Sequence, residues 1–447
     1  MSASDTIVAL ATSAGKAALA VVRVSGPQAR AVLAGLGVKP GAPRRVKRVS
    51  FRDGAGEVFD HGLLLWFSGP RSFTGEDVAE LHLHGGRAIV EAAISTAIAA
   101  GARLAEPGEF TRRAFENGKL GLDQAEAIAD LIDASLRQQA KQAIRQLDGE
   151  LGARYRGWRE RLISPLAELE ALVDFPDEGT VGDRSQALRE IGRLQEELRA
   201  AAVEGSRGRS VREGYRVAIV GPPNAGKSTL FNGLVGRDAA IIADQPGTTR
   251  DVIETVVEIG GYPVLLADTA GLRDTKDVVE GEGVRRARAW ADAADRRLWV
   301  FEGQGENDGP WGDPDADWHA GDLLVVNKSD RGRELGLDLM AKAETLGLAV
   351  ARASARSGDV GAVSRWLAKT VQADLSGAEF PAVTRRRHLE CLTEAMACLE
   401  AVQRDWGSPE LAAESMRRAA KALALIVGAV HTEDVLDRVF ATFCIGK

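Results

Sequence analysis

The sequence predicts a multidomain protein that combines α/β segments with all-α segments. Short apolar runs and one helical stretch fill residues 1–118, and turn signals separate them. Residues 123–205 carry apolar side chains at helical spacing, and this spacing returns after residue 380. Between these two stretches, residues 215–375 alternate apolar runs with helical patterns, which is typical of a parallel, doubly wound sheet.

The first segment is expected to form an α/β domain. Its apolar runs predict strands at 7–10, 18–24, 61–67 and 78–84, with a helix near 86–100.

The next segment is expected to be helical. Its first run, 123–147, predicts an apolar helical stripe formed by Ala125, Ile128, Ala129, Ile132 and Leu136. A second run, 159–175, contains Pro165 and is expected to kink there. The Gly-, Ser- and Arg-rich segment 206–215 predicts an exposed linker.

The alternating segment predicts five strands, at 216–221, 264–268, 297–303, 322–328 and 349–354. Because helical stretches flank this segment on both sides, we expect it to be inserted into a helical domain. The predicted domains are an α/β domain 1–118, a helical part 119–213, the inserted domain 214–376 and a second helical part 377–447.

Composition and charge exclude several classes of protein. No apolar run approaches the 18 or so residues of a membrane-spanning helix, and the first residues lack the basic region of a signal peptide. The three cysteines, Cys391, Cys398 and Cys444, form no CxxC pattern, so we expect a reducing, cytoplasmic setting without a disulfide scaffold. The net charge of −7 means that any contact with nucleic acid requires a local basic patch.

The strongest motif is GPPNAGKS at 221–228, which matches G-x-x-x-x-G-K-[ST] between a predicted strand and a predicted helix. Backbone N–H groups of such a loop bind phosphate, and the following helix N-terminus adds to their attraction. Lys227 is expected to reach the β- and γ-phosphates, and the Ser228 hydroxyl to bind Mg²⁺. A chance match of a glycine-rich turn is the weaker interpretation.

Three further motifs point to guanine nucleotides. DTAG at 268–271 offers Asp268 to Mg²⁺ through water, and NKSD at 327–330 offers Asp330 to the N1–H and N2 amino group of guanine. Adenine lacks that pair of donors. The third motif, Ser354-Ala355, follows the last apolar run and is expected to contact the base from the next loop. The residues expected to contact GTP are Asn224, Ala225, Gly226, Lys227, Ser228, Thr229, Asp268, Thr269, Ala270, Gly271, Asn327, Lys328, Asp330, Ser354 and Ala355. The four motifs in this order predict a GTPase domain.

One position departs from the Ras-like pattern. Ras-like enzymes orient the attacking water with a Gln directly after the DxxG glycine, whereas this chain has Leu272 there. Hydrolysis therefore needs another group, or the domain only binds nucleotide.

Several long strings stand out along the chain: DTIVA, SFTGEDVAELHLHGG, PGEFTRRAFENGKLGLDQAEA, GPPNAGKSTLFN, PGTTRD, DTAGLR and the terminal FCIGK. Together they resemble the MnmE (TrmE) family of tRNA-modification GTPases, and the resemblance runs from Thr6 to Lys447. It implies an N-terminal folate-binding domain, a discontinuous helical domain and an inserted G domain.

The resemblance also implies an activity and partners. The family acts as a homodimer and forms a heterotetramer with the flavoprotein MnmG (GidA). Together they add an aminomethyl-type group, such as carboxymethylaminomethyl, at C5 of the wobble uridine of certain tRNAs. The one-carbon unit comes from a tetrahydrofolate derivative, and GTP hydrolysis is required.

In this family K⁺ occupies the place that an arginine finger takes elsewhere. The resemblance implies that Asn224, Ala243, Gln245 and Thr248 surround K⁺, and that Thr249 joins Ser228 on Mg²⁺. The family's water-orienting glutamate stands in an E-x-x-G-[IV] pattern, which is matched here by Glu280. The neighbouring Glu282 remains an alternative, and a solvated carboxylate at a helix start is the plainer interpretation of Glu280.

For folate, the resemblance implies Arg23, Glu80, Lys119 and Lys447. Each of these, taken singly, also fits an ordinary surface charge. Cys444 is expected near this site, and a buried small residue is the simpler explanation of it. His82 and His84 alternate along one strand and could bind a metal, but no third ligand is near in sequence, which favours a hydrogen-bonded role.

Two other functions fit the same motifs. The chain could be a regulatory GTP-binding switch in tRNA or ribosome assembly that performs no chemistry itself. It could also be a folate-dependent methyltransferase with a passive G domain.

Overall fold

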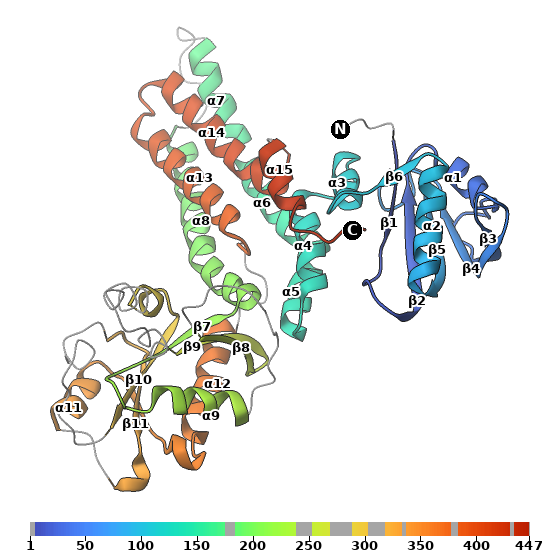
Figure 1. Ribbon diagram of the computed structural model, residues 1–447. Helices are drawn as coiled ribbons and strands as arrows, with labels where there is room; N and C mark the ends of the chain where they lie inside the picture. Colours follow the sequence, from blue (N-terminus) through green and yellow to red (C-terminus); the bar gives the residue numbers. More distant parts are fainter. Residues whose placement is uncertain are drawn as a thin grey trace, which may run out of the picture. The chain divides into compact units, whose positions relative to one another are not determined.

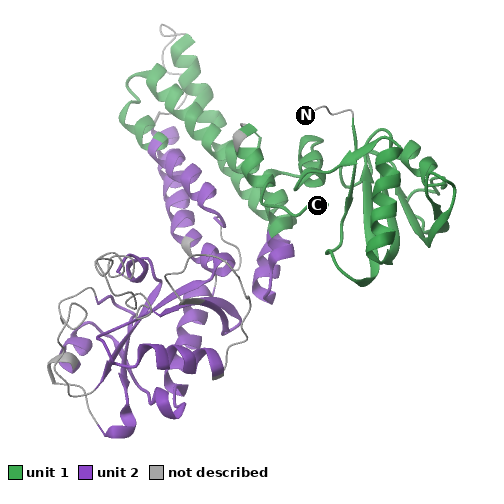
Figure 2. Cartoon of the chain, viewed as in Figure 1, with its two compact units in different colours: residues 1–129, 146–183, 398–447 green, residues 130–145, 184–397 purple. Residues whose placement is uncertain are grey.

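The computed structural model describes residues 5–174, 184–237, 253–268, 288–302, 318–332, 337–376, 383–429 and 433–446. The chain forms two compact units (Figure 2). The first comprises Met1–Ala129, Gln146–Asp183 and Cys398–Lys447, and the second comprises Asp130–Arg145 and Arg184–Ala397. Each unit therefore draws on segments that are distant in sequence.

The first unit begins with a six-stranded sheet (Figure 1). Its strands are β1 (Thr6–Leu10), β2 (Ala17–Ser25), β3 (Lys47–Arg52), β4 (Val58–Phe67), β5 (Val78–Gly85) and β6 (Ala102–Leu104). Their order is β3-β4-β5-β2-β1-β6, and all neighbours are antiparallel except β1 and β6. The four predicted strands are confirmed, whereas β3 and β6 were not predicted.

Two helices, α1 (Ala29–Gly35) and α2 (Arg87–Ala99), cover one face of this sheet. The predicted helix near 86–100 is therefore confirmed. Strand β2 shows the alternation that such a sheet requires, because Val22 and Val24 are fully buried in the core under the helices. Arg23, between them, consequently points to the opposite face of the sheet.

Helices complete the first unit: α3 (Glu109–Glu116), α4 (Leu122–Asp133), α6 (Glu150–Arg161), α7 (Ile163–Asp174), α14 (Pro409–Val427) and α15 (Glu433–Phe440). Helix α14 packs against both α6 and α7, so helices from either side of the alternating segment share one core. Phe440 and Phe443 pack with Phe115 and Leu122 of the N-terminal part. A bridge between Pro107 and Ile445 extends this contact toward the C-terminus.

The helical prediction for 123–147 is only partly correct. Helix α4 ends at Asp133, and α5 (Arg137–Leu147) begins after a short break that includes Leu136. Gln139 caps the start of α5 at this break, because its Oε1 accepts hydrogen bonds from the N–H groups of Ser135 and Leu136, both at 3.1 Å. Ile132 on the predicted stripe is 42% exposed, so the stripe is buried only at its start.

The kink predicted at Pro165 is confirmed. Helix α6 ends at Arg161 and α7 begins at Ile163. Proline removes its own N–H donor and its ring crowds the carbonyl four residues earlier, which is that of Arg161. The interruption therefore falls where the proline requires it.

The predicted linker at 206–215 is wrong. Helix α8 (Arg184–Glu213) runs through this segment, and Val211 and Tyr215 are buried in the core of the second unit. A Cβ on Gly205 would lie 2.4 Å from the Cβ of Val383, so this glycine permits close packing rather than flexibility. Tertiary contacts here override the local composition.

The second unit contains the other six-stranded sheet. Its strands are β7 (Tyr215–Val220), β8 (Ile253–Ile259), β9 (Tyr262–Asp268), β10 (Arg296–Glu302), β11 (Leu323–Asn327) and β12 (Ala349–Arg352). The order is β12-β11-β10-β7-β9-β8, and only the edge strand β8 is antiparallel. The five predicted strands and the doubly wound fold are confirmed, whereas β8 was not predicted.

Helices cover both faces of this sheet. They are α9 (Lys227–Arg237), α11 (Leu337–Thr345) and α12 (Gly361–Leu375). Helix α13 (Arg386–Arg404) comes after them in the chain. Leu230 of α9 and Leu367 of α12 belong to the core on one face, and Ala343 of α11 belongs to the core on the other. The apolar runs of β7, β10 and β11 are continuous because both faces of these strands are buried.

Candidate nucleotide-binding site

The four predicted nucleotide motifs meet at one edge of the second sheet. Strand β7 ends just before the phosphate loop, β9 ends at Asp268, β11 ends at Asn327, and β12 ends two residues before Ser354. Because these strands are parallel, their carboxyl ends lie at the same edge. Open α/β sheets bind ligands at this edge, where the chain order reverses, as it does here around β7.

The phosphate loop has the backbone that anion binding requires. Gly221 and Gly226 have φ angles of 145° and 92°. A Cβ on Gly221 would lie 2.2 Å from the carbonyl oxygen of Val300, and one on Gly226 would lie 2.3 Å from Nδ2 of Asn327. Only glycine fits these positions. Helix α9 begins directly after the loop, so its free N–H groups face the same space.

Lys227 is held at the mouth of this loop. Its side chain is buried, and its Nζ donates hydrogen bonds to the carbonyl oxygens of Gly221 (3.0 Å) and Pro222 (2.8 Å). A bound phosphate would offer the ammonium group a charged acceptor, which makes a stronger hydrogen bond than a carbonyl. Ser228 and Thr229 follow in the first turn of α9 and are exposed.

Asn327 ties the phosphate loop to the base-binding loops. Its Nδ2 donates to the carbonyl of Ala225 at 2.8 Å, and its Oδ1 accepts from the N–H of Ala355 at 3.1 Å. With only 2% of Asn327 exposed, both bonds form away from water. Lys328 adds a second link, since its Nζ donates to the carbonyl of Asn224 at 2.9 Å.

Asp330 presents a fixed carboxylate to solvent. The Ser354 hydroxyl donates to its Oδ1 at 2.7 Å, and this hydrogen bond lowers the pKa of Asp330 below the usual carboxyl value. The carboxylate is therefore ionised at neutral pH and able to accept hydrogen bonds from two N–H donors. Reciprocal backbone bonds between Ser354 and Asp359 hold the serine in place.

Glu302 is a residue of this site that the sequence did not single out. It ends β10 at the same edge of the sheet, pairs with Lys328, and lies 3.3 Å from Arg331. The sequence could have pointed to Glu302, because it is an acidic residue near the end of a predicted strand. Its carboxylate holds the Lys328 side chain in place. Lys328 has a φ of 59°, and this backbone turn and the aliphatic stem of its side chain shape the base-binding loop.

The structure brings Arg23 and Glu80 together on the face of the first sheet opposite α1 and α2. Arg23 Nη2 lies 3.0 Å from Glu80 Oε1, and its guanidinium lies 5.6 Å from the ring centres of Phe73 and Phe110. Lys119 instead donates from Nζ to the carbonyl of Pro70 at 2.9 Å.

The hydrogen-bonded role predicted for the two histidines is confirmed for His84 alone, whose Nδ1 lies 2.7 Å from Asp60 Oδ1. His82 Nε2 lies 3.6 Å from Glu80 and is buried without a hydrogen-bond partner in the described part of the chain. Among the described residues, no group of three His, Cys, Asp or Glu side chains could hold a metal ion.

Cys444 is exposed, which contradicts the expectation of a buried small residue. The short bridge between Pro107 and Ile445 occupies this stretch of backbone, and the N–H of Gly108 donates to the carbonyl of Cys444. The Cys444 side chain consequently stays outside the apolar cluster that Phe443 enters.

Several predicted site residues lie outside the described part of the chain. They are Thr269, Ala270, Gly271, Leu272, Ala243, Gln245, Thr248, Thr249, Glu280, Glu282 and Lys447.

Three features meet at one edge of a doubly wound sheet: a phosphate loop, the buried Asn327 that links it to the base-binding loops, and the Asp330 carboxylate, which can accept hydrogen bonds from guanine. Together they define a guanine-nucleotide-binding protein of the P-loop class. The family model for the MnmE helical domain matches residues 122–444, and the model described as the GTP-binding protein TrmE N-terminus matches residues 6–119. The chain belongs to the MnmE (TrmE) family.

Full-length relatives agree with this assignment. The proteins named tRNA modification GTPase MnmE from Caulobacter vibrioides and Phenylobacterium zucineum are 51% and 49% identical to this chain. Each match covers 99% of this chain and 100% of the relative. Within the described residues, no helix is both long enough and apolar enough to cross a bilayer.

Proposed function

We propose that this chain hydrolyses GTP and that the hydrolysis serves tRNA modification in the cytoplasm. The observation that carries the proposal is the meeting of the phosphate loop, Asp268, Asn327 and Asp330 at one sheet edge. The names of the relatives support the link to tRNA. The target that the family resemblance suggests is C5 of the wobble uridine, which would receive a carboxymethylaminomethyl-type group.

Mg²⁺ fits the oxygen donors of this edge. Ser228 is exposed in the first turn of α9, and the buried Asp268 ends β9. Hydroxyl and carboxylate oxygens are the ligands that Mg²⁺ prefers. We propose that Ser228 and Thr249 bind the ion directly and that Asp268 holds it through water. The ion would neutralise charge on the β- and γ-phosphates.

K⁺ is the second ion that we propose, held by Asn224, Ala243, Gln245 and Thr248. Asn224 supports this choice because it sits at the top of the phosphate loop with a φ of 63° and an exposed side chain. An amide oxygen there suits a hard cation. The cation would stabilise the charge that develops as the γ-phosphate leaves.

The test is GTP hydrolysis by the full chain in KCl and in NaCl at equal ionic strength. An ion that replaces an arginine finger contributes a large part of a factor of about 10³–10⁵ in rate. We therefore expect hydrolysis to be at least about tenfold faster in KCl. Equal rates in the two salts would exclude the potassium site while leaving the GTPase assignment intact.

We also propose that Arg23, Glu80, Lys119 and Lys447 bind a tetrahydrofolate derivative that supplies the one-carbon unit. The partly buried Arg23–Glu80 pair beside Phe73 and Phe110 supports this, since a pterin presents N–H donors and an aromatic face.

Calorimetric titration of the full chain with 5-formyltetrahydrofolate tests the folate site. Arg23→Gln should weaken binding at least about tenfold, because it removes a charge-assisted contact. Arg30→Gln is the matched control, since Arg30 pairs with Asp77 on the same domain and is exposed. Equal losses in both variants would contradict the assignment.

The remaining proposals concern assembly. We propose a homodimer formed through the N-terminal domain, and a heterotetramer with the flavoprotein MnmG (GidA). The proposed domains are 1–118, 119–213, 214–376 and 377–447, with the third inserted between the two helical parts. Packing of α14 against α6 and α7 supports that insertion.

A further inference from the structure

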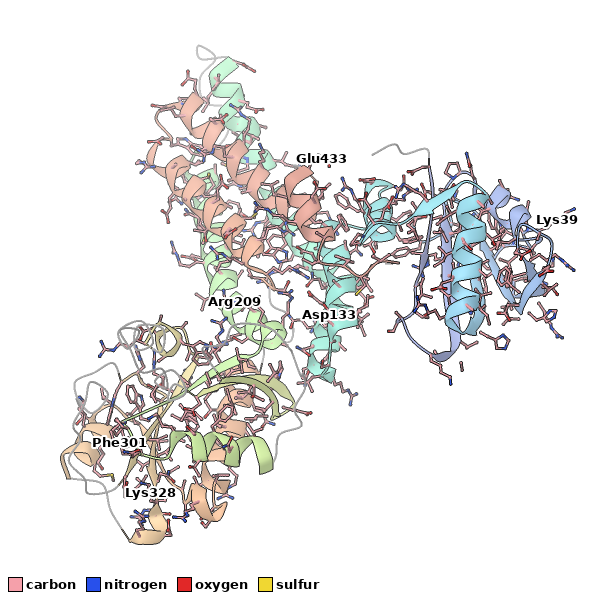
Figure 3. All side chains as sticks on the ribbon, viewed as in Figure 1. Lys39, Asp133, Arg209, Phe301, Lys328 and Glu433 are labelled. Carbon is pink, nitrogen blue, oxygen red and sulfur yellow. The ribbon has the colours of Figure 1, made fainter. Side chains whose placement is uncertain are left out.

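A run of exposed cations precedes and follows the start of edge strand β3. Segment 39–52 holds six Lys and Arg residues and no Asp or Glu, although the whole chain has a net charge of −7. The six exposed residues are Lys39, Arg44, Arg45, Lys47, Arg48 and Arg52. Figure 3 labels Lys39 at this end of the first sheet. A dense positive surface thus stands out from an acidic chain.

No carboxylate in the described part of the chain pairs with these cations. Arg44 and Arg52 make hydrogen bonds, but their acceptors are the carbonyls of Arg71 (2.9 Å) and Gly56 (2.8 Å). By contrast, the exposed Arg87 of the same domain pairs with Glu91 at 2.6 Å. The charge of segment 39–52 therefore remains available to an external anion.

The position of the cations suits a long anion that runs along the edge. Among the described strands, β3 pairs only with β4, and successive side chains of a strand point to opposite faces. Lys47 and Arg48 thus place charge on both sides of the edge. Charges also protect an exposed strand edge against pairing. That role does not account for Lys39, Arg44 and Arg45, which precede the strand.

One short loop joins this surface to a proposed folate residue. Arg44 donates to the carbonyl of Arg71, and Lys119 donates to the carbonyl of the adjacent Pro70. Consecutive residues lie about 3.8 Å apart along the chain. An anion bound at Arg44 would therefore lie close to the loop that Lys119 contacts, where we place the one-carbon donor.

We propose that segment 39–52 together with Arg71, here called the basic edge, binds the sugar-phosphate backbone of tRNA. This inference rests on the proposed function, which makes tRNA the substrate. Five of these seven cations are arginines, and the planar guanidinium group matches phosphate in a bidentate geometry. The basic edge is the local positive patch that an acidic tRNA-binding chain requires.

The test compares tRNA binding by the full chain and by the triple variant Arg45→Gln, Lys47→Gln, Arg48→Gln. Binding of a fluorescently labelled tRNA transcript is followed by anisotropy between roughly 50 and 200 mM KCl. At about 100 mM KCl we expect the variant to bind at least about tenfold more weakly. The slope of log affinity against log salt should also become less steep by about 2 to 3, because each phosphate that the variant leaves without a cation lowers the slope by about 1.

The matched control removes three cations that already have carboxylate partners. It is Arg87→Gln, Arg386→Gln, Arg417→Gln, each from an exposed ion pair. This control changes the net charge equally and should keep the affinity within about twofold, since paired cations release few counterions. GTP hydrolysis, measured in parallel, should be normal in both variants and reports on the proposed function separately.

Three outcomes would overturn the basic edge. One is equal tRNA affinity in the triple variant and the wild type, and another is equal weakening in the control. The third is a triple variant that loses binding to vesicles of anionic phospholipid but keeps its affinity for tRNA. In each case normal hydrolysis would leave the GTPase proposal standing.

Discussion

Asp330→Asn is expected to weaken GTP binding at least about a hundredfold and to strengthen binding of xanthosine triphosphate. The Asp330 carboxylate, fixed by the Ser354 hydroxyl, can accept both the N1–H and the N2 amino group of guanine. An amide offers one acceptor oxygen, and its NH₂ group would face a guanine donor. Hydrogen bonds to charged groups contribute about 1.5–3 kcal/mol each, so losing two accounts for a change of this size.

Xanthine carries a carbonyl where guanine carries the amino group, and that carbonyl can accept from the amide of the variant. Nucleotide affinity measured with fluorescent GTP and by competition with xanthosine triphosphate checks both directions of the change. Asp359→Asn is the control, because Asp359 lies exposed in the adjoining loop and contacts Ser354 through backbone atoms. If GTP affinity survives Asp330→Asn, the assignment of the base-binding loop is wrong.

The nucleotide site was predictable because each of its parts is local in sequence. The phosphate loop needs glycines at fixed positions, and each motif follows an apolar run that forms a buried strand. Because the strands are parallel, the motifs that follow their carboxyl ends lie at one edge of the sheet, and no knowledge of the strand order is needed to predict this. The hydrogen bonds that join the loops, from Asn327 to Ala225 and Ala355, depend on strand register and were not predictable.

The helical segments were harder to predict because distant contacts decide them. Segment 206–215 has the composition of a linker, but Arg212 pairs with Asp130 and Gln142 donates to the carbonyl of Gly208. These contacts, together with burial of Val211, make the helix favourable there. Conversely, the apolar spacing at 123–147 continues across the break between α4 and α5, where Gln139 caps the start of α5. The break was not predictable, because apolar spacing does not reveal a capping side chain.

Strands β3 and β8 escaped prediction for a related reason. Both lie at sheet edges, where one side of the strand lacks a partner. Charged and polar side chains are tolerated there, so the sequence of β3 has the pattern of a basic run rather than of a strand. The basic side chains that made β3 hard to recognise in the sequence also belong to the basic edge.

Glu280→Ala is expected to lower the rate of GTP hydrolysis about 10²–10³-fold and to leave GTP affinity unchanged. The side chain at position 272 is leucine, which can neither orient water nor accept its proton, so another group must do so. A carboxylate that acts only on the attacking water contributes to the transition state and not to nucleotide binding. Single-turnover hydrolysis and equilibrium binding of fluorescent GTP separate the two effects.

Glu282→Ala decides between the two neighbouring glutamates. If Glu280 orients the water, the Glu282 variant should hydrolyse GTP within about twofold of the wild type; reversed results would move the role to Glu282. The potassium effect gives an independent check, because the cation and the carboxylate act on different charges in the transition state. The residual activity of Glu280→Ala should therefore still be faster in KCl than in NaCl. A residual rate that no longer distinguishes the two salts would mean that Glu280 acts by holding the ion rather than the water.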